Sequence, residues 1–574
     1  MWARWRTEVV TAGLAAALGV AYLLLPRPGS DLSAQVARAD FFAEHGWAVV
    51  DLRWYAGVNQ LGYSLVSQPV MALLGVRVTG VLALLVSAVT FAALLRRTRV
   101  ARPLPGALVG AVCLAGNLLS GRVTYALGVA LGLAALLALT YPRLRPAVVV
   151  AALLASATSP VAGLFLGLAG VALLAARRWG DGLLVAVPAA VPLAVSAGLF
   201  GDGGWMNISQ ADAVRAVGMS LLVAVLVPHR PVRYGALLSA AGVVAATLVH
   251  TPVGLNATRL AVMFGLPLLA ACARPPGWPP ARLSRILPAR PPVRPPARLS
   301  PILPAGPRGR PPAQPDSAPP AQPSEHPSRP GVGRPARLWA GIAVRWRPWA
   351  LVAVLVAVCW WQPPVVVADL RDIGNPTADP GFFAPLRDRL AGGSLTGRVE
   401  IPPTRDYWEA AYMGDVPLAR GWLRQADIDR NPLFFTSVPG AAGTGVPLTA
   451  ESYRDWLSRE AVQYVAVPKA PLSWVGRAEA QLIGGGLPYL TPVWSDARWQ
   501  LYAVTDPTPI VAAPGRQVSH TASTVTFDAP AAGDVRVRVR YSPWLRVDGG
   551  ATVAADGEWT VVRVPAAGRY NLRS

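Results

Sequence analysis

The sequence predicts a polytopic α-helical membrane protein with about eleven transmembrane helices, followed by an α+β domain that ends in a β-sandwich. Three observations lead to this prediction. Hydrophobic residues make up 53% of the 574 residues, more than in an average soluble protein. Apolar runs alternate with clusters of arginine over residues 1–273. After residue 367 the chain changes to the mixed pattern of polar and apolar residues that is typical of soluble domains.

The apolar runs predict the transmembrane segments. A spanning helix needs about 20 apolar residues, and several runs here are shorter or contain Gly or Pro, so their ends are approximate. The predicted spans are residues 9–26, 78–95, 105–120, 123–140, 146–158, 161–176, 183–200, 212–228, 235–250, 258–273 and 348–367. Residues 1–273 therefore form a membrane domain, and residues 338–367 supply the last transmembrane helix.

Arginines predict the orientation of these helices in the plasma membrane. If the N-terminus is cytoplasmic, every second connection should be basic, and the connections after the second, fourth, sixth and eighth spans are. Their basic residues are Arg96, Arg97, Arg99, Arg102, Arg143, Arg145, Arg177, Arg178, Arg230 and Arg233. An odd number of spans then places the C-terminal domain on the extracytoplasmic side. The net charge of +22 lies in such clusters and in one linker, so we predict no nucleic-acid partner.

Three further segments complete the predicted domain organisation. Residues 274–337 are rich in Pro and Arg and should form a disordered cytoplasmic linker. Residues 368–515 should form an extracytoplasmic α/β domain, with a capped helix from Thr449 to Leu457 and a strand from Val462 to Val467. Residues 516–574 should form a small β-sandwich, because Val535, Val537 and Val539 alternate with arginines as in a half-buried strand.

The first outer loop, residues 27–77, is long for a connection within a helical bundle, and long loops in compact proteins are often functional. Ser30 or Asp31 is expected to cap a helix that ends at Gly46. Residues 61–76 are apolar but interrupted by Gln68-Pro69, which predicts an interfacial or re-entrant helix rather than a full span.

The candidate chemical groups lie at the outer membrane interface. The sequence contains no phosphate-binding glycine loop, no nucleophile elbow and no histidine pair with zinc-ligand spacing. A carboxylate at this interface could deprotonate an acceptor hydroxyl, and an arginine could hold a lipid phosphate. The groups of these two kinds are Asp31, Asp40, Asp51, Asp202 and Arg259.

Several motifs resemble the GT-C superfamily of polyprenyl-phosphate-dependent glycosyltransferases, in particular large actinobacterial membrane proteins. They are the segments Asp31–Gln35 and Asp51–Tyr55 after the first helix, and the interfacial Gly62-Tyr63-Ser64. The segment Pro252–Leu260 before a late helix and the outer segment Ala419–Gln425 add to the resemblance. It implies an inverting enzyme that moves a sugar from a polyprenyl-phosphate donor in the bilayer to a cell-wall glycan acceptor.

The resemblance also implies roles for individual residues. The catalytic base maps best onto Asp31, with Asp40 and Asp51 as rivals, and Arg259 or Arg53 would bind the donor phosphate. The substrate-binding candidates are Trp54, Tyr55, Asn256 and Asp202. Many members have an adjacent acidic pair where this chain has Asp31-Leu32. No residue is assigned as a metal ligand, no cofactor is predicted with certainty, and a divalent metal stays open.

Two other functions and several structural roles compete with this hypothesis. A membrane transporter of a solute or a lipid-linked sugar is the first alternative, although it would normally carry intramembrane charges. A non-catalytic envelope scaffold is the second. For single residues, Asp31 could act only as a helix cap, Arg259 could anchor a helix at the headgroups, and Arg53 could belong to an aromatic belt.

Overall fold

The computed structural model describes residues 2–273, 349–438, 440–441 and 445–574. The described residues up to 273 and from 353 onward belong to one compact unit. The predicted linker, residues 274–337, and the first part of the segment 338–367 lie outside the described residues.

A helix occurs at each of the predicted spans. These helices are α1 (Trp2–Leu24), α4 (Val76–Arg97), α5 (Pro103–Leu119), α6 (Val123–Ala138), α7 (Arg145–Thr158), α8 (Pro160–Ala175), α9 (Trp179–Phe200), α10 (Gln210–Leu226), α11 (Arg230–Leu248), α12 (Arg259–Cys272) and the helix Trp349–Trp361. By length and composition, 5 helices of the described part could cross a membrane, and the others are shorter or less apolar. The chain is therefore a multi-pass membrane protein, whereas the number of spans stays a prediction.

Small residues let neighbouring helices approach closely. A Cβ added to Gly106 of α5 would lie 2.4 Å from the Cβ of Ala271 in α12. A Cβ added to Gly128 of α6 would lie 2.8 Å from that of Ala162 in α8. Because lipid tails are as apolar as the side chains, such close packing, rather than exclusion from water, holds membrane helices together.

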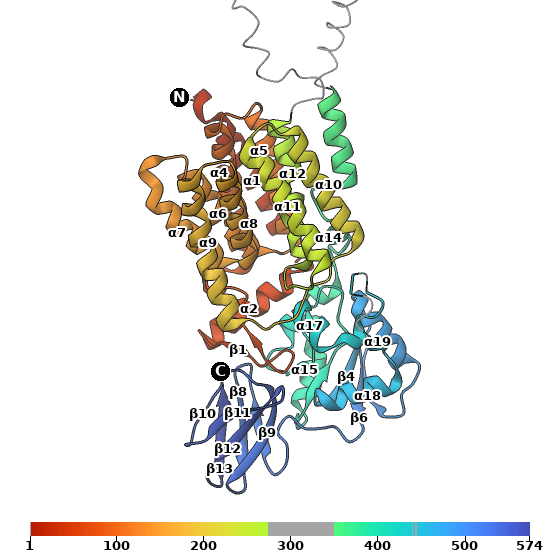
Figure 1. Ribbon diagram of the computed structural model, residues 1–574. Coiled ribbons are helices and arrows are strands. Elements are labelled where there is room, and N and C mark those ends of the chain that lie inside the picture. The colour runs from red at the N-terminus through yellow and green to blue at the C-terminus, as the bar shows by residue number, and fades with distance from the viewer. Residues whose placement is uncertain (1, 274–348, 439, 442–444) are drawn as a thin grey trace, which may run out of the picture. The chain divides into compact units, whose positions relative to one another are not determined.

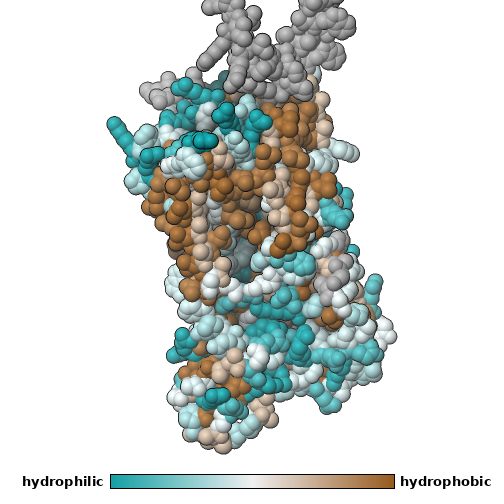
Figure 2. Space-filling model, in the orientation of Figure 1, coloured by the Kyte–Doolittle hydropathy of each residue, from teal (hydrophilic) through white to brown (hydrophobic). Residues whose placement is uncertain are grey.

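The basic connections gather at one end of the helical bundle. There Arg97 donates to the Thr140 carbonyl at 2.8 Å, and Arg145 pairs with Asp181 at 2.9 Å. The first outer loop and the C-terminal part of the chain lie at the opposite end (Figure 1). Apolar side chains cover much of the bundle surface in view, and the C-terminal part is largely hydrophilic (Figure 2). The arginine pattern predicts this separation of the basic connections from the first outer loop and the C-terminal part.

The first outer loop contains α2 (Leu32–His45), β1 (Val50–Asp51), β2 (Val58–Asn59) and α3 (Ser67–Leu74). Helix α2 ends at Gly46, as predicted, where the backbone φ of 58° favours glycine. Asp31 occupies the N-cap position but its side chain makes no capping hydrogen bond, so the predicted cap does not form.

Helix α3 is shorter than predicted. It begins at Ser67, whose backbone N–H donates to the Ser64 hydroxyl at 2.9 Å. Pro69 then lies in the first turn, where a missing N–H breaks no hydrogen bond of the helix. The interruption that the sequence predicts at Gln68-Pro69 therefore does not occur within α3.

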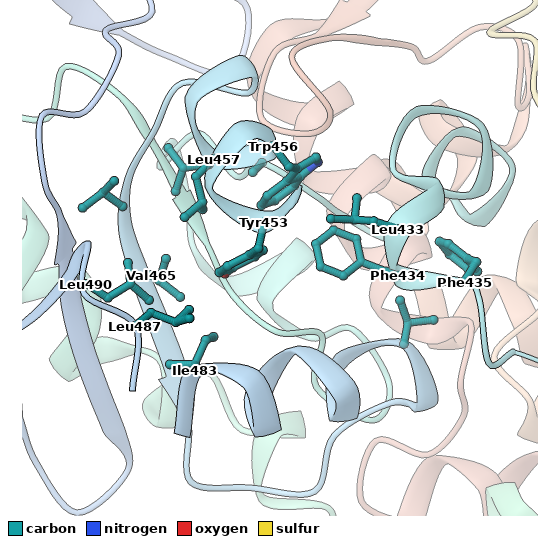
Figure 3. Packing of buried hydrophobic residues seen from close by; sticks show 14 of the residues in the cluster. Leu433, Phe434, Phe435, Tyr453, Trp456, Leu457, Val465, Ile483, Leu487 and Leu490 are labelled. Atoms are coloured by element: carbon teal, nitrogen blue, oxygen red, sulfur yellow. The ribbon is translucent and has the colours of Figure 1, made fainter. Parts of the chain in front are cut away.

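The segment after the last predicted span builds a mixed domain around a four-stranded sheet of order β3-β4-β6-β5. Its elements are α14 (Val367–Arg371), α15 (Ala384–Ala391), β3 (Arg398–Glu400), α16 (Glu409–Tyr412), α17 (Arg424–Arg430), α18 (Ala450–Arg459), β4 (Val462–Pro468), α19 (Trp474–Gly484), β5 (Leu490–Ser495) and β6 (Trp499–Val504). A capping box between Thr449 and Ser452 starts α18, which confirms the predicted capped helix and following strand. Aromatic and aliphatic side chains of α18 and its neighbours fill the core (Figure 3).

A fully buried ion cluster lies in this core. The Arg420 guanidinium, 1% exposed, contacts the carboxylates of Glu400 and Glu479 and lies 3.7 Å from the ring centroid of Phe434. The Tyr453 hydroxyl donates to Glu479 at 2.9 Å. Arg420 is therefore a structural residue, because its guanidinium is the charged partner of two carboxyl groups that water does not reach.

The last residues form two antiparallel sheets, β10-β13-β8-β7 and β11-β12-β9. The strands are β7 (Arg516–His520), β8 (Thr524–Ala529), β9 (Gly533–Arg540), β10 (Arg546–Val547), β11 (Thr552–Asp556), β12 (Trp559–Val564) and β13 (Gly568–Arg573). Val535, Val537 and Val539 of β9 are at most 2% exposed, which confirms the predicted half-buried strand. Val50 and Leu52 of the first outer loop belong to the same hydrophobic cluster as these valines, so the loop and the sheets share a core.

Replacing Arg420 should strongly destabilise the mixed domain. The variant Arg420→Met leaves Glu400 and Glu479 buried without a counter-charge, which should cost about 3–5 kcal/mol. We expect a lower midpoint in thermal unfolding of the detergent-solubilised protein. As the control, Arg569→Ala breaks an exposed pair with Asp528 and should change stability by less than about 1 kcal/mol. Equal midpoints for both variants would contradict this assignment.

Candidate active site

Asp31 lies where the first outer loop meets two other segments of the bundle. Its carboxylate accepts a hydrogen bond from Arg122 Nε at 2.9 Å and lies 3.6 Å from Arg259 Nη2. The three side chains are 16%, 24% and 19% exposed, so they are neither sealed in a core nor fully solvated. Asp31 is therefore a reachable carboxylate held between two guanidinium groups.

Two glycines make this meeting possible. Gly29 has φ 110°, and a Cβ there would lie 2.5 Å from the Leu119 carbonyl oxygen. Gly121 has φ 76°, and a Cβ there would lie 2.4 Å from the backbone nitrogen of Leu32. The loop before α2 thus crosses the α5–α6 connection at a backbone distance that no other residue permits. This crossing places Arg122 beside Asp31.

Arg259 comes to the cluster from the start of α12. The 3₁₀ turn η2 (Gly254–Thr258) leads into that helix, and the guanidinium lies 5.3 Å from the ring centroid of Tyr125. Its position facing Asp31 joins it to the other two charged groups.

A second carboxylate, Asp369 of α14, lies close to the same cluster. It is 2% exposed and accepts a hydrogen bond from the Ser120 hydroxyl. Burial raises the pKa of Asp369 above its ordinary value, Ser120 and Arg122 oppose the rise, and the charge of Asp31 adds to it. The segment after the last predicted span therefore contributes to the electrostatics around Asp31.

An aromatic pair borders the cluster. Tyr63 and Trp422 are half-buried and pack edge to face, with ring centroids 6.2 Å apart. Gln35 donates to the Tyr63 hydroxyl at 2.9 Å, and the Arg38 guanidinium lies 3.9 Å from the Tyr63 ring centroid. The Trp422 indole N–H donates to the carbonyl of Ser30, directly before Asp31. The C-terminal part of the chain thus reaches the site through Trp422.

The other two candidate bases lie elsewhere. Asp51 is completely buried, and its carboxylate contacts Arg53 Nη2 at 2.8 Å and accepts from Gln60 at 2.8 Å. Arg53, the rival phosphate ligand, is 6% exposed and engaged in that pair. Asp40 is exposed on α2. Neither Asp51 nor Arg53 is accessible in this structure, so we do not carry them into the proposed function.

The candidate substrate-binding residues form packing contacts outside the Asp31 cluster. Trp54 and Tyr55 are at most 1% exposed, and the Tyr55 hydroxyl donates to the Gly421 carbonyl. Asn256 donates to the Met206 sulfur at 3.2 Å. Asp202 accepts from the backbone N–H of Asn59 at 3.0 Å and so ties its loop to β2. We do not carry these four residues into the proposed function either.

Sequence reasoning missed Arg122, Asp369, Tyr63 and Trp422 as site residues. One signal pointed to Arg122, because it is a basic residue in a connection that the arginine alternation leaves almost uncharged. Asp369 carried no such signal, since it lies 338 residues from Asp31 and only the fold brings the two together. Among the described residues no group of three or more His, Cys, Asp or Glu could hold a metal ion.

No protein-family profile and no curated protein matches the chain. Solved structures that resemble it include the mycobacterial arabinofuranosyltransferase AftD, with 16% identity, a TM-score of 0.40, and coverage of 92% of this chain and 41% of AftD. Another is ArnT from Cupriavidus metallidurans in the apo state, with 12% identity, a TM-score of 0.41, and coverage of 86% of this chain and 97% of ArnT. The chain spans about two fifths of the length of AftD.

Two buried carboxyl groups near α2, those of Asp406 and Glu409, should make the stability of the protein depend on pH. The Ser33 hydroxyl of α2 donates to the Asp406 carbonyl at 2.6 Å, and Glu409 follows in α16. Burial raises the pKa of Asp406 to about 6 and that of Glu409 to about 7. Hydrogen bonds from Thr404 to Glu409 only partly oppose this rise.

The sign of this dependence follows from proton binding. The folded protein keeps the Glu409 proton up to a pH of about 7, whereas the unfolded chain releases it near 4.5. Stability should therefore fall as pH rises between these values, by an amount on the order of 3 kcal/mol for Glu409. Thermal unfolding across that range would measure the fall, and Glu409→Gln should make it shallower and leave the part that comes from Asp406. A profile that rises with pH in both proteins would contradict the prediction.

Proposed function

We propose that the chain is a membrane glycosyltransferase that moves a sugar from a polyprenyl-phosphate donor to a glycan acceptor of the cell envelope. The observation that carries the proposal is the state of Asp31. Its side chain does not cap α2, although it occupies the N-cap position, and it lies partly exposed between Arg122 and Arg259. A carboxylate freed from a structural task and placed among cations suits acid–base chemistry at an anionic substrate.

The two arginines supply the donor site. A sugar phosphodiester carries one negative charge, and guanidinium groups bind phosphate oxygens through paired N–H donors. In the free protein Asp31 is the partner of both guanidiniums. A bound phosphate would take over part of that pairing and leave Asp31 available to accept a proton. The same arginines would then stabilise the leaving polyprenyl phosphate as its charge increases.

The reaction is a single displacement. The acceptor hydroxyl oxygen attacks the anomeric carbon, the bond from that carbon to the phosphate oxygen breaks, and polyprenyl phosphate leaves with the bonding electrons. The hydroxyl proton passes to Asp31. Attack from the face opposite the phosphate inverts the configuration at the anomeric carbon.

The surroundings of the cluster suit one substrate that enters from the bilayer and another that enters from the water. Figure 2 shows a recess between the apolar helices, next to the hydrophilic C-terminal part. A lipid-linked donor could enter there from the bilayer, while Tyr63 and Trp422 border the cluster on the side of the outer domain. We accordingly place the cluster at the outer face of the plasma membrane, with the N-terminus in the cytoplasm, which the sorting of the basic connections supports.

Changing Asp31 to Asn should abolish transfer while preserving the shape of the site. Loss of a general base typically lowers the rate about 100-fold or more. The assay uses the full-length protein in lipid nanodiscs with radiolabelled polyprenyl-phosphate sugars, polyprenyl-phosphate arabinofuranose among them, and extracted envelope glycan as the acceptor. Asp528→Asn, which changes a solvent-exposed carboxylate of β8 paired with Arg569, is the matched control and should remain active.

Each other outcome of this assay has a defined meaning. Full activity of Asp31→Asn together with loss in Asp40→Asn would move the base to the rival residue. Transport of the labelled lipid without a glycosylated product would favour the transporter. Wild-type protein that binds glycan but turns over no donor in the panel would favour the scaffold.

Removing either guanidinium should weaken donor binding rather than acceptor binding. Arg122→Ala and Arg259→Ala each lose a charge-assisted contact to phosphate, which should raise the donor KM about tenfold or more. The acceptor KM should change much less. Arg215→Ala, on the exposed side of α10, removes the same charge away from the cluster and should change neither. A rise in the acceptor KM alone would contradict the assignment of these arginines.

A further inference from the structure

A polar pocket of about 460 Å³ lies in the C-terminal part of the chain, apart from the Asp31 cluster. Its walls come from the end of α17 and the turn after it, the end of α18, and the edge of the β11-β12-β9 sheet. The polar lining residues are Asp429, Arg430, Arg459, Arg540, Tyr541 and Glu558. This volume falls within the range of roughly 300–1,000 Å³ that small-ligand sites occupy.

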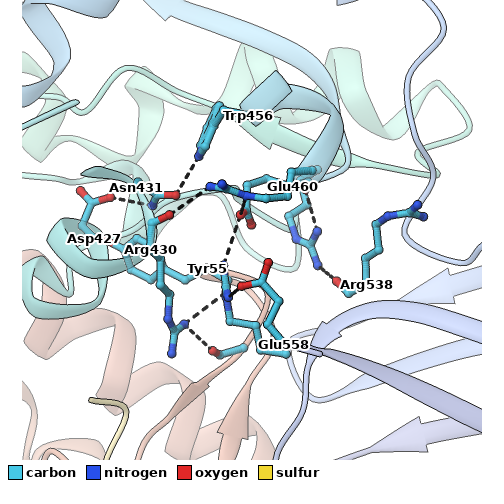
Figure 4. A network of polar contacts seen from close by, with 12 residues as sticks. Tyr55, Asp427, Arg430, Asn431, Trp456, Glu460, Arg538 and Glu558 are labelled. Carbon is cyan, nitrogen blue, oxygen red and sulfur yellow. Dashed lines mark hydrogen bonds and ion pairs between the residues drawn. The ribbon is translucent and has the colours of Figure 1, made fainter. Parts of the chain in front are cut away.

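Two arginines of the pocket, Arg430 and Arg540, are anchored on the first outer loop (Figure 4). Three successive residues, Tyr55, Ala56 and Gly57, have φ of 53°, 63° and 126°, a run that side chains disfavour. Arg430 donates to the Gly57 carbonyl at 2.9 Å, and Arg540 donates to the Tyr55 carbonyl at 3.1 Å. The two arginines therefore hold the strained turn in place, and their own positions are fixed by it.

Every arginine of the pocket is paired with a carboxylate. Three arginines face two lining carboxylates, Glu460 behind them contacts Arg540 and Arg459, and Asp202 lies 3.5 Å from Arg430. An anion would meet Asp429 and Glu558, and a cation would meet the guanidiniums. Because each guanidinium already has a carboxylate partner, the pocket carries no excess positive charge, and it favours an uncharged ligand that has both hydrogen-bond donors and acceptors.

Several groups on the rim keep unused hydrogen-bonding capacity. In the described part of the chain, no partner is found for the Asp429 carboxylate, for the Tyr541 hydroxyl or for Oε1 of Glu558. Tyr541 also exposes 43% of its surface, which offers an aromatic face beside these polar groups. Carboxylates that accept from adjacent hydroxyls, together with an aromatic ring against C–H groups, match the chemistry of a sugar.

We propose that this pocket binds an uncharged oligosaccharide. Its role as the place where the acceptor glycan is held rests on the proposed glycosyltransferase function, whereas saccharide binding itself does not. The pocket and Asp31 are joined by one continuous segment, because the turn at residues 55–57 and α2 both belong to the first outer loop.

Binding is tested on the full-length protein in lipid nanodiscs by saturation-transfer NMR. The probes are short neutral oligosaccharides of arabinan, galactan, mannan and dextran, and the acidic comparison is oligogalacturonate, all at millimolar concentration. We expect at least one neutral oligosaccharide to bind and oligogalacturonate to bind more weakly. Tyr541→Ala and Asp429→Ala should each weaken the neutral binding about tenfold.

The controls separate this proposal from the catalytic one. Arg569→Ala, on β13 of the other sheet, should bind like the wild type, and unchanged thermal unfolding would show that each variant is folded. Asp31→Asn should also bind like the wild type. Saccharide binding without sugar transfer would support the assignment of the pocket and contradict the proposed glycosyltransferase activity. The pocket assignment is overturned if no neutral probe binds, if the acidic probe binds better, or if both pocket variants bind as tightly as the wild type.

Discussion

The close backbone crossing of the first outer loop over the α5–α6 connection is the constraint on which the site depends. Gly29 and Gly121 allow it, because a Cβ at either position would overlap backbone atoms of the opposite segment. The crossing brings Arg122 to the start of α2, where it removes the Asp31 carboxylate from its ordinary capping role. A helix terminus that would otherwise be closed by its own side chain thereby becomes a charged site.

Most other charges near this loop serve to hold it in place. Asp51 and Arg53 form a buried pair inside the loop, and the Arg53 carbonyl accepts from the backbone N–H of Leu418 at 2.7 Å. The Leu52 N–H donates to the Ala522 carbonyl at the same distance, so the loop is pinned to both parts of the C-terminal region. Buried pairs of this kind are costly to break once formed. They differ from the Asp31 cluster, whose charged groups remain partly exposed.

The loop therefore connects two chemically different places. At one end Asp31 lies between cations and beside a half-buried aromatic pair, which suits an anionic donor and proton transfer. Further along the loop, the turn at residues 55–57 accepts hydrogen bonds from Arg430 and Arg540, two arginines of a polar pocket that suits an uncharged polar ligand. Helix α2 is anchored between them through the Ser33 contact to Asp406. A donor site and an acceptor site on one rigid segment would keep their separation constant during the reaction.

The sequence by itself determined the elements whose signals are local. Apolar runs located the bundle helices, Gly46 marked the end of α2, Thr449 marked the start of α18, and alternating valines marked β9. These features arise from periodicity and backbone preference, which neighbouring residues decide. The arginine pattern likewise predicted the two ends of the bundle.

Only the tertiary structure decided which polar groups meet. Asp31 was identifiable as a candidate, but its partner Arg122 is 91 residues away, and no local pattern links them. The same holds for Trp54 and Trp422, since nothing in their flanking sequences tells which is buried and which borders the site. Capping preference, a local tendency worth about 1 kcal/mol, gave way at Asp31 to a charge-assisted contact that only folding could create.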